Sequence, residues 1–192
     1  MSALTAATTI LALSTAAHLL VTFGLVRRLR LHTDLLNHLT QNTSHLLPDH
    51  SPLPAFTAPT TDGTTISHTR LRHPAALALL AVDCPHCQTS LPAFTAYIRS
   101  AGYARDQVLA VVTAGDHTAP TARQDMLDAL APLATVVCEP ATGGTITTAL
   151  KVQAFPTFYL THPDATLAAG THTVRDLPPT TPQTPARPDP TK

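Results

Sequence analysis

The chain has 192 residues, and its 12 lysines and arginines balance its 12 aspartates and glutamates, so the formal net charge is zero. A chain of this length is expected to form one domain with accessory segments. It has no basic block and few aromatic residues for base stacking, so we expect no nucleic-acid partner. Three cysteines are too few for a disulfide scaffold.

The N-terminal stretch, residues 4–26, carries no charged side chain and is long enough to cross a membrane as a helix. We therefore expect residues 1–28 to be a transmembrane anchor. A cleaved signal peptide and a buried helix are the alternatives, and the absence of a positive n-region argues against the signal peptide. Arg27, Arg28 and Arg30 come after the apolar run, and by the positive-inside rule they favour a cytoplasmic location for the domain behind them.

Two further segments flank the expected domain. Residues 29–52 are rich in leucine and histidine and end in prolines, which predicts a helical stalk followed by a linker. The proline- and threonine-rich residues 176–192 cannot form a helix and are predicted to be a disordered tail. These limits leave residues 53–175 for the folded domain.

The pattern inside this domain predicts a βαβ unit, then a helix, then an antiparallel hairpin, which is typical of an α/β fold. Asp62-Gly63 marks the turn of an additional, opening hairpin over residues 55–66. Strands are then expected at residues 75–82, 107–113, 134–138, 157–161 and 166–169, and helices at residues 86–100, 119–130 and 145–150.

A Cys-x-x-Cys motif, Cys84-Pro85-His86-Cys87, stands where the strand at residues 75–82 gives way to a helix. A thiolate at a helix N-terminus is stabilised by unpaired N–H groups and by the helix dipole. A second thiol one helical turn further on can attack the mixed disulfide that the first one forms. The spacing therefore predicts attack by Cys84 and resolution by Cys87, with Pro85 in the first helical turn.

Three alternatives to disulfide exchange remain open for this chain. Cys84, Cys87 and a histidine could hold copper or zinc, although a zinc site normally needs a second ligand pair and no second Cys-x-x-Cys is present. His68 and His73 have a spacing that zinc could use, but they lie in a predicted loop. The two cysteines could also form a passive disulfide, or the chain could be a redox-inert membrane adaptor that docks through its stalk and tail.

A second motif, Phe155-Pro156-Thr157, stands at the start of another apolar strand, and the two motifs together resemble the thioredoxin superfamily. The opening hairpin and the apolar N-terminus make residues 53–171 most similar to its TlpA-like and MauD-like membrane-anchored members. This resemblance implies a thioredoxin-like fold, with a central mixed sheet flanked by helices, behind an N-terminal transmembrane helix. It also implies a thiol–disulfide oxidoreductase that needs no cofactor and acts on protein thiols or disulfides.

The resemblance also assigns roles to single residues. Pro156 should be cis and face the Cys-x-x-Cys motif, and Phe155, Pro156 and Thr157 should bind the partner protein. His86 lies between the cysteines, as in DsbA-like oxidants, and should stabilise the thiolate and make the pair more oxidising; a structural cap of the helix is the alternative. Ala78 replaces the buried aspartate of thioredoxin, so the proton of the resolving thiol needs another route.

Members of the resembled family work outside the cytoplasmic membrane. In spite of the three arginines, we therefore expect a single-pass protein of the cell membrane with an extracytoplasmic catalytic domain and a membrane or extracytoplasmic redox partner. The family's C-terminal helix should be shortened or missing, because prolines follow Leu177. Cys138 ends a predicted strand after two valines, and we expect it to be buried and inert. The histidines other than His86 are scattered and are expected to face solvent.

Overall fold

The computed structural model describes Leu13–Thr15, His18 and residues 46–179. The chain divides into two units, Met1–Ser44 and His45–Lys192. Among the described residues, no helix has the length and apolar character needed to span a membrane. Most of the predicted anchor, stalk and tail lies outside the described residues, and all three segments stay predictions.

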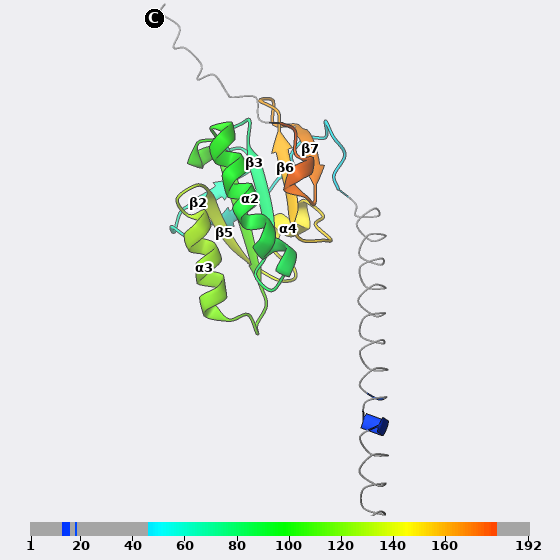
Figure 1. Ribbon diagram of the computed structural model, residues 1–192. Helices are drawn as coiled ribbons and strands as arrows, with labels where there is room; N and C mark the ends of the chain where they lie inside the picture. The colour runs from blue at the N-terminus through cyan, green and yellow to red at the C-terminus, as the bar shows by residue number, and fades with distance from the viewer. Residues whose placement is uncertain (1–12, 16–17, 19–45, 180–192) are drawn as a thin grey trace, which may run out of the picture. The chain divides into compact units, whose positions relative to one another are not determined.

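The second unit is built on a five-stranded sheet with the strand order β5-β4-β3-β6-β7 (Figure 1). Strands β3, β4 and β5 run parallel to one another, whereas β6 and β7 pair antiparallel, so the predicted mixed sheet is confirmed. The bounds of the strands are Ala76–Ala81 for β3, Val108–Ala114 for β4, Thr135–Pro140 for β5, Thr157–Thr161 for β6 and Leu167–Thr171 for β7.

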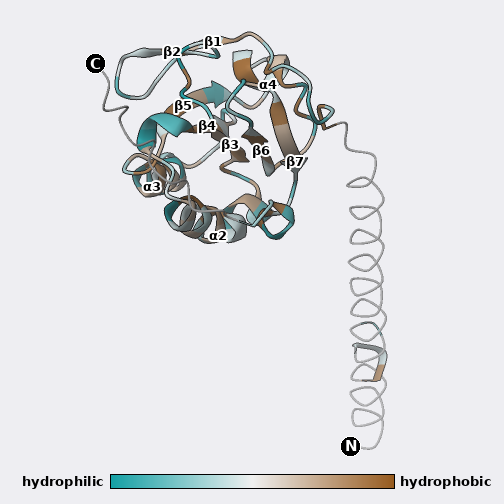
Figure 2. Ribbon diagram, turned by 90° about the horizontal axis from the view of Figure 1, so that it is seen from above, coloured by the Kyte–Doolittle hydropathy of each residue, from teal (hydrophilic) through white to brown (hydrophobic). Residues whose placement is uncertain are grey.

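Helices cover both faces of this sheet. Seen from above, α2 and α3 lie on one side of the strands, and α4 and the β1–β2 hairpin lie on the other (Figure 2). The bounds of these elements are Pro85–Ala101 for α2, Pro120–Leu130 for α3, Thr145–Ala149 for α4, Thr57–Pro59 for β1 and Thr65–Ser67 for β2. Each predicted strand and helix of residues 55–169 is thus present, with its bounds shifted by a few residues at most.

The central strand β3 is buried on both faces, as its uninterrupted apolar run predicts. Ala76, Ala78 and Leu80 pack into the core under α2 and α3, and Leu77 and Leu79 pack into the core on the α4 side. A leucine fully buried in this way stabilises the fold by about 1.5–3 kcal/mol. The sheet is therefore a rigid support for the loops at the ends of its strands.

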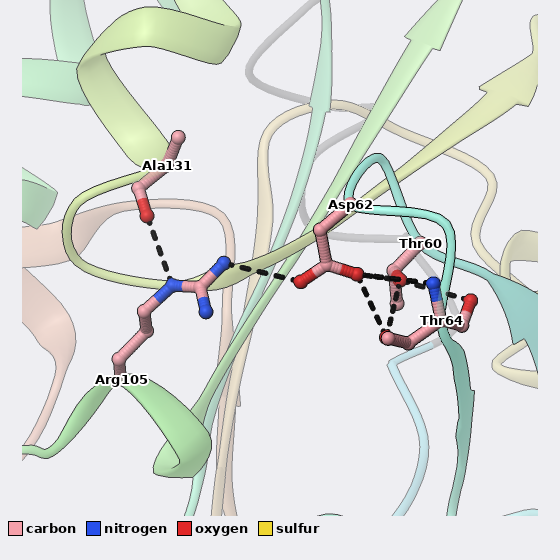
Figure 3. Close-up of polar contacts among 5 residues, drawn as sticks. All are labelled: Thr60, Asp62, Thr64, Arg105 and Ala131. Carbon is pink, nitrogen blue, oxygen red and sulfur yellow. Dashed lines mark hydrogen bonds and ion pairs between the residues drawn. The ribbon is translucent and has the colours of Figure 1, made fainter.

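The turn of the opening hairpin is fixed by Asp62 (Figure 3). Its Oδ1 accepts hydrogen bonds from the hydroxyls of Thr60 and Thr64, at 2.5 and 2.7 Å, and its Oδ2 lies 3.5 Å from the Arg105 guanidinium. The Arg105 Nε in turn donates to the Ala131 carbonyl at 3.0 Å. These hydrogen bonds, that from Thr60 foremost, hold the pKa of Asp62 well below its usual value.

The described part of the C-terminus has a single 3-10 turn, Val174–Asp176, where the resembled fold has a helix. Leu177 is buried against the core under α2, and the Tyr97 hydroxyl donates to the Pro178 carbonyl at 3.0 Å. The expected shortening of the last helix is confirmed as far as residue 179. The turn and Leu177 cover part of the face that such a helix would cover.

Candidate functional site

Cys84 occupies the N-cap of α2, in the connection that follows β3. Its backbone is extended, with φ −99° and ψ 112°, and its Sγ accepts the Cys87 N–H at 3.4 Å. Pro85 begins the helix, where its missing N–H costs no hydrogen bond. Gln88 steadies the connection by donating from Nε2 to the Val82 carbonyl at 3.0 Å. The half-buried sulfur of Cys84 therefore lies at the positive end of the helix, as predicted.

Cys87 lies one turn further along α2 and is fully buried. Its Sγ accepts the Ala81 N–H at 3.3 Å. Burial raises the pKa of the Cys87 thiol, and the neighbouring Cys84 adds to this effect, while the Ala81 N–H works against it. The cysteines are free thiols in this structure, and of the two in the motif only Cys84 has a sulfur that a large partner could reach.

The second motif lies beside the first, because the strands β3 and β6 are neighbours in the sheet. The Phe155–Pro156 peptide bond is cis, as the resemblance implies, and Leu79 of β3 pairs with Thr157 at the start of β6. This register brings the Phe155 carbonyl oxygen to 3.5 Å from Cys84 Sγ, which donates to it. Pro156 is buried and Phe155 half-buried, so the backbone and ring of Phe155 form the accessible part of the loop.

Thr157 faces into the protein. Its side chain is 1 % exposed, and its hydroxyl donates to the Ala154 carbonyl at 2.7 Å. The Thr157 Oγ1 also lies 3.1 Å from Nδ1 of His172, which follows β7. The side chain of Thr157 thus supports the loop from behind, and the expectation that His172 faces solvent was wrong. The β6–β7 pairing is the signal that could have found His172, because it sets Phe158 opposite Thr171.

His86 and Asp83 are polar neighbours of the cysteines in the sequence, and their side chains have different surroundings. The His86 ring is exposed, and no described residue makes a hydrogen bond with it; the cap of α2 is Cys84, so the alternative role of His86 as the cap is wrong. The Asp83 carboxylate accepts a short hydrogen bond from the Thr118 hydroxyl, which itself accepts the Gly115 N–H at 2.9 Å. Asp83 is thus engaged with the loop between β4 and α3.

A hollow of about 470 Å³ lies beside the second motif. Phe155 and Val152 provide its apolar wall, Thr147 and Thr148 its hydroxyls, and Lys151 is the charged residue that lines it. The hollow extends from Phe155 to residues of α4.

Cys138 is exposed, and the expectation that it is buried was wrong. It lies near the end of β5, and its side chain is left exposed although Val136 and Val137 on the same strand are buried. Packing around the sulfur still raises the pKa of this thiol, and the charge of Arg123 on α3 works in the opposite direction.

The candidate metal ligands are dispersed. In the part of the chain that the structure describes, no three histidine, cysteine or acidic side chains are grouped so that they could hold a metal ion. His68 Nδ1 lies 3.5 Å from the Phe56 carbonyl oxygen, and His73 Nδ1 lies 2.7 Å from Thr161 Oγ1.

Comparison with known proteins identifies the fold. No family model matches the sequence, and no curated protein matches it. Among solved structures, a thio-disulfide isomerase from Thermus thermophilus superposes with a TM-score of 0.51 at 15% identity, over 66% of this chain and 87% of that chain. A thiol-disulfide oxidoreductase from Bacteroides fragilis gives 0.49 at 14% identity, over 62% and 89%. A secreted disulfide oxidoreductase from Mycobacterium tuberculosis gives 0.47 at 21%, over 67% and 87%.

At these identities the likeness concerns the fold. This likeness, together with the strand order and the cis bond, confirms the predicted thioredoxin-like fold for the described part of the second unit.

Proposed function

We propose that this chain is a membrane-tethered thiol–disulfide oxidoreductase that exchanges disulfides with protein partners through Cys84 and Cys87. The observation that carries the proposal is the contrast between two thiols one helical turn apart. Cys84 is accessible at the start of α2 and faces the Phe155 carbonyl, whereas Cys87 is buried. The activity named for the Thermus thermophilus protein agrees with this as an analogy of fold.

The exchange proceeds in two balanced steps. The Cys84 thiolate attacks a partner disulfide, forms a mixed disulfide and releases one partner thiolate. The Cys87 thiolate then attacks Cys84 Sγ, releases the second partner thiolate and leaves a Cys84–Cys87 disulfide. The partner gains two electrons and the chain loses two, and the reverse sequence oxidises a partner dithiol. Burial raises the pKa of the Cys87 thiol, and the Ala81 N–H stabilises the thiolate that resolves the mixed disulfide.

His86 is proposed to tune this pair rather than to react. Its exposed ring sits in the first turn of α2, between the two cysteines, where a positive charge would favour the Cys84 thiolate and the reduced state. His86→Ala should therefore make the pair more reducing. A shift of about 30 mV corresponds to about 1.4 kcal/mol, the scale of one charge-assisted contact. Equilibration with glutathione measures it, and an unchanged potential would remove this role.

Tethering and location are proposed from the sequence. The uncharged residues 4–26 support a single-pass anchor, and we place the domain outside the cytoplasm. After an alkaline carbonate wash, the full chain should stay with membranes, and a variant with Leu19→Arg and Leu20→Arg should be released. A reporter active only outside the cytoplasm, fused after Lys192, should be active; activity of a cytoplasmic reporter alone would reverse the orientation.

The activity is tested with the purified full chain. In the presence of a dithiol reductant, it should accelerate the reduction of insulin disulfides, and Cys84→Ser should abolish this. Cys138→Ser is the matched control, because that sulfur lies on β5 and outside the motif. The reduced chain should titrate three thiols and the oxidised chain one. A redox-inert adaptor would show no change on oxidation, and a metal site would retain copper or zinc under reducing conditions.

A further inference from the structure

Three consecutive carbonyl groups beside Cys84 each have a different partner. The Ala154 carbonyl accepts from the Thr157 hydroxyl at 2.7 Å, and the Phe155 carbonyl accepts from Cys84 Sγ at 3.5 Å. The Pro156 carbonyl oxygen lies 2.9 Å from His172 Nδ1. The carbonyl that faces the nucleophile therefore stands between two others that are held from inside the protein.

The partners of His172 define which nitrogen carries its hydrogen. A carbonyl oxygen can only accept, so Nδ1 must donate to Pro156, and Thr157 Oγ1 lies 3.1 Å from the same nitrogen. The other ring nitrogen, Nε2, is buried and has no hydrogen-bond partner among the described residues. A proton there would be a buried donor without an acceptor, which is costly. The arrangement fits an Nδ1–H group that acts as a fixed donor to the Pro156 carbonyl.

We propose that His172 is a positioning residue for disulfide exchange: it holds the Pro156 carbonyl and thereby fixes the loop whose Phe155 carbonyl faces Cys84. This inference rests on the proposed function. The ring does not contact either cysteine sulfur by hydrogen bond; it acts through the backbone of residues 154–157. Loss of the donor would leave the buried Pro156 carbonyl unsatisfied and free the loop to move relative to Cys84.

Substitutions at His172 can separate the donor from the ring's bulk. Asn has its amide nitrogen on Cγ, as His has Nδ1, so His172→Asn can keep the donor. Gln has its amide nitrogen one bond further out, nearer to the place of Nε2, and Leu fills space without a donor. We expect exchange with a protein disulfide to slow about tenfold to a hundredfold in His172→Leu and His172→Gln, and His172→Asn to recover most of the rate.

His73 provides a matched control at the other end of β6. Its Nδ1 lies 2.7 Å from Thr161 Oγ1, and its Nε2 is likewise buried without a partner among the described residues. His73→Leu should lower stability without a selective effect on exchange, because Thr161 and Thr157 occupy opposite ends of the strand.

The experiment compares two rates for each full-length variant, with Cys138→Ser in the background so that the exposed second thiol does not react. The first is exchange with insulin, which requires the loop to seat a partner, and the second is alkylation of Cys84 by iodoacetamide, which reports the reactivity of the thiol itself. A lowered ratio of the two rates in His172→Leu and His172→Gln, restored in His172→Asn, supports the proposal. If His172→Leu does not fold, the Asn and Gln variants decide. If the wild type is active and the ratio is unchanged in the variants, the proposed role of His172 is overturned and the proposed function stands. A wild type that exchanges no disulfides overturns the proposed function and this role with it.

Discussion

The sulfur of Cys84 and the carbonyl oxygen of Phe155 lie 3.5 Å apart, although 71 positions separate the two residues in the chain. They meet because β3 and β6 are neighbouring antiparallel strands with Leu79 opposite Thr157. The loop that follows β3 and the loop that precedes β6 therefore lie at the same end of these strands. In the proposed function, a partner sulfur bonded to Cys84 lies next to this carbonyl. We therefore propose that the backbone of the second motif is part of the surface that a partner meets.

The different burial of the two thiols predicts which variant traps partners. Cys87→Ser should accumulate mixed disulfides on Cys84, because the resolving thiol is gone, and Cys84→Ser should trap none. Non-reducing electrophoresis of cells expressing the full chain, with Cys138→Ser in the background of both variants, measures this. Trapping by Cys84→Ser and not by Cys87→Ser would mean that the two cysteines have the opposite roles.

Local patterns in the sequence predicted the elements that depend on neighbouring residues. The apolar run before Cys84 and the helical periodicity after it place the motif at a strand–helix junction, and Asp62-Gly63 predicts the first turn. These features depend on residues only a few positions apart, so they can be recognised in the sequence. The cis bond at Pro156 and its approach to Cys84 came from the resemblance, because no local pattern shows which residues face each other across a sheet.

The errors concern features that depend on contacts between distant parts of the chain. Cys138 follows two valines and reads as buried, but its side chain is exposed near the end of β5, and no periodicity in the sequence shows how far a helix covers a strand. His172 resembles nine other scattered histidines until the β6–β7 pairing brings it to Pro156. Likewise, the engagement of Asp83 with Thr118 requires the β3–β4 pairing that brings their loops together.

The turn at Asp62 predicts a loss of stability in acid. Its pKa in the folded protein lies below the usual value of about 3.9, so it contributes stability above that pH that is lost as pH falls towards the folded pKa. Asp62→Asn should lower stability near neutral pH and make the acid limb less steep. Urea unfolding as a function of pH measures both. An acid limb that is equally steep in the wild type and in Asp62→Asn would contradict this account.

Gly170 on β7 is required by the ring that lies against it. A Cβ at this position would come within 2.7 Å of Cε1 of Tyr159, its fully buried partner on β6. The ring cannot move aside easily, because its hydroxyl also accepts the Leu47 N–H at 3.2 Å. Gly170→Ala should therefore cost about 1–3 kcal/mol of stability in urea unfolding. Gly115→Ala is the control, since its Cβ would meet nothing closer than 3.8 Å; equal losses in both variants would contradict this account.

The burial of Cys87 predicts how the second step of exchange depends on pH. Burial raises the pKa of this thiol well above that of a free cysteine. The buried residue Ala78 of β3 has no carboxylate that could accept the proton of this thiol. Only the thiolate resolves the mixed disulfide, so the rate of resolution should rise about tenfold per pH unit through the neutral and mildly alkaline range. Mixing the reduced Cys138→Ser protein with an aromatic disulfide reagent in a stopped-flow instrument should give two phases of thiolate release.

The first phase reports attack by Cys84 and the second reports resolution by Cys87, so Cys87→Ser should show the first phase alone. The rise of about tenfold per pH unit should appear in the second phase, because the folded-state pKa of Cys87 is raised and its thiolate becomes more abundant as pH rises. If the second phase is independent of pH between about 6 and 9, Cys87 is already ionised in the mixed disulfide. The Ala81 N–H would then outweigh burial once the charge of Cys84 has been removed by bond formation.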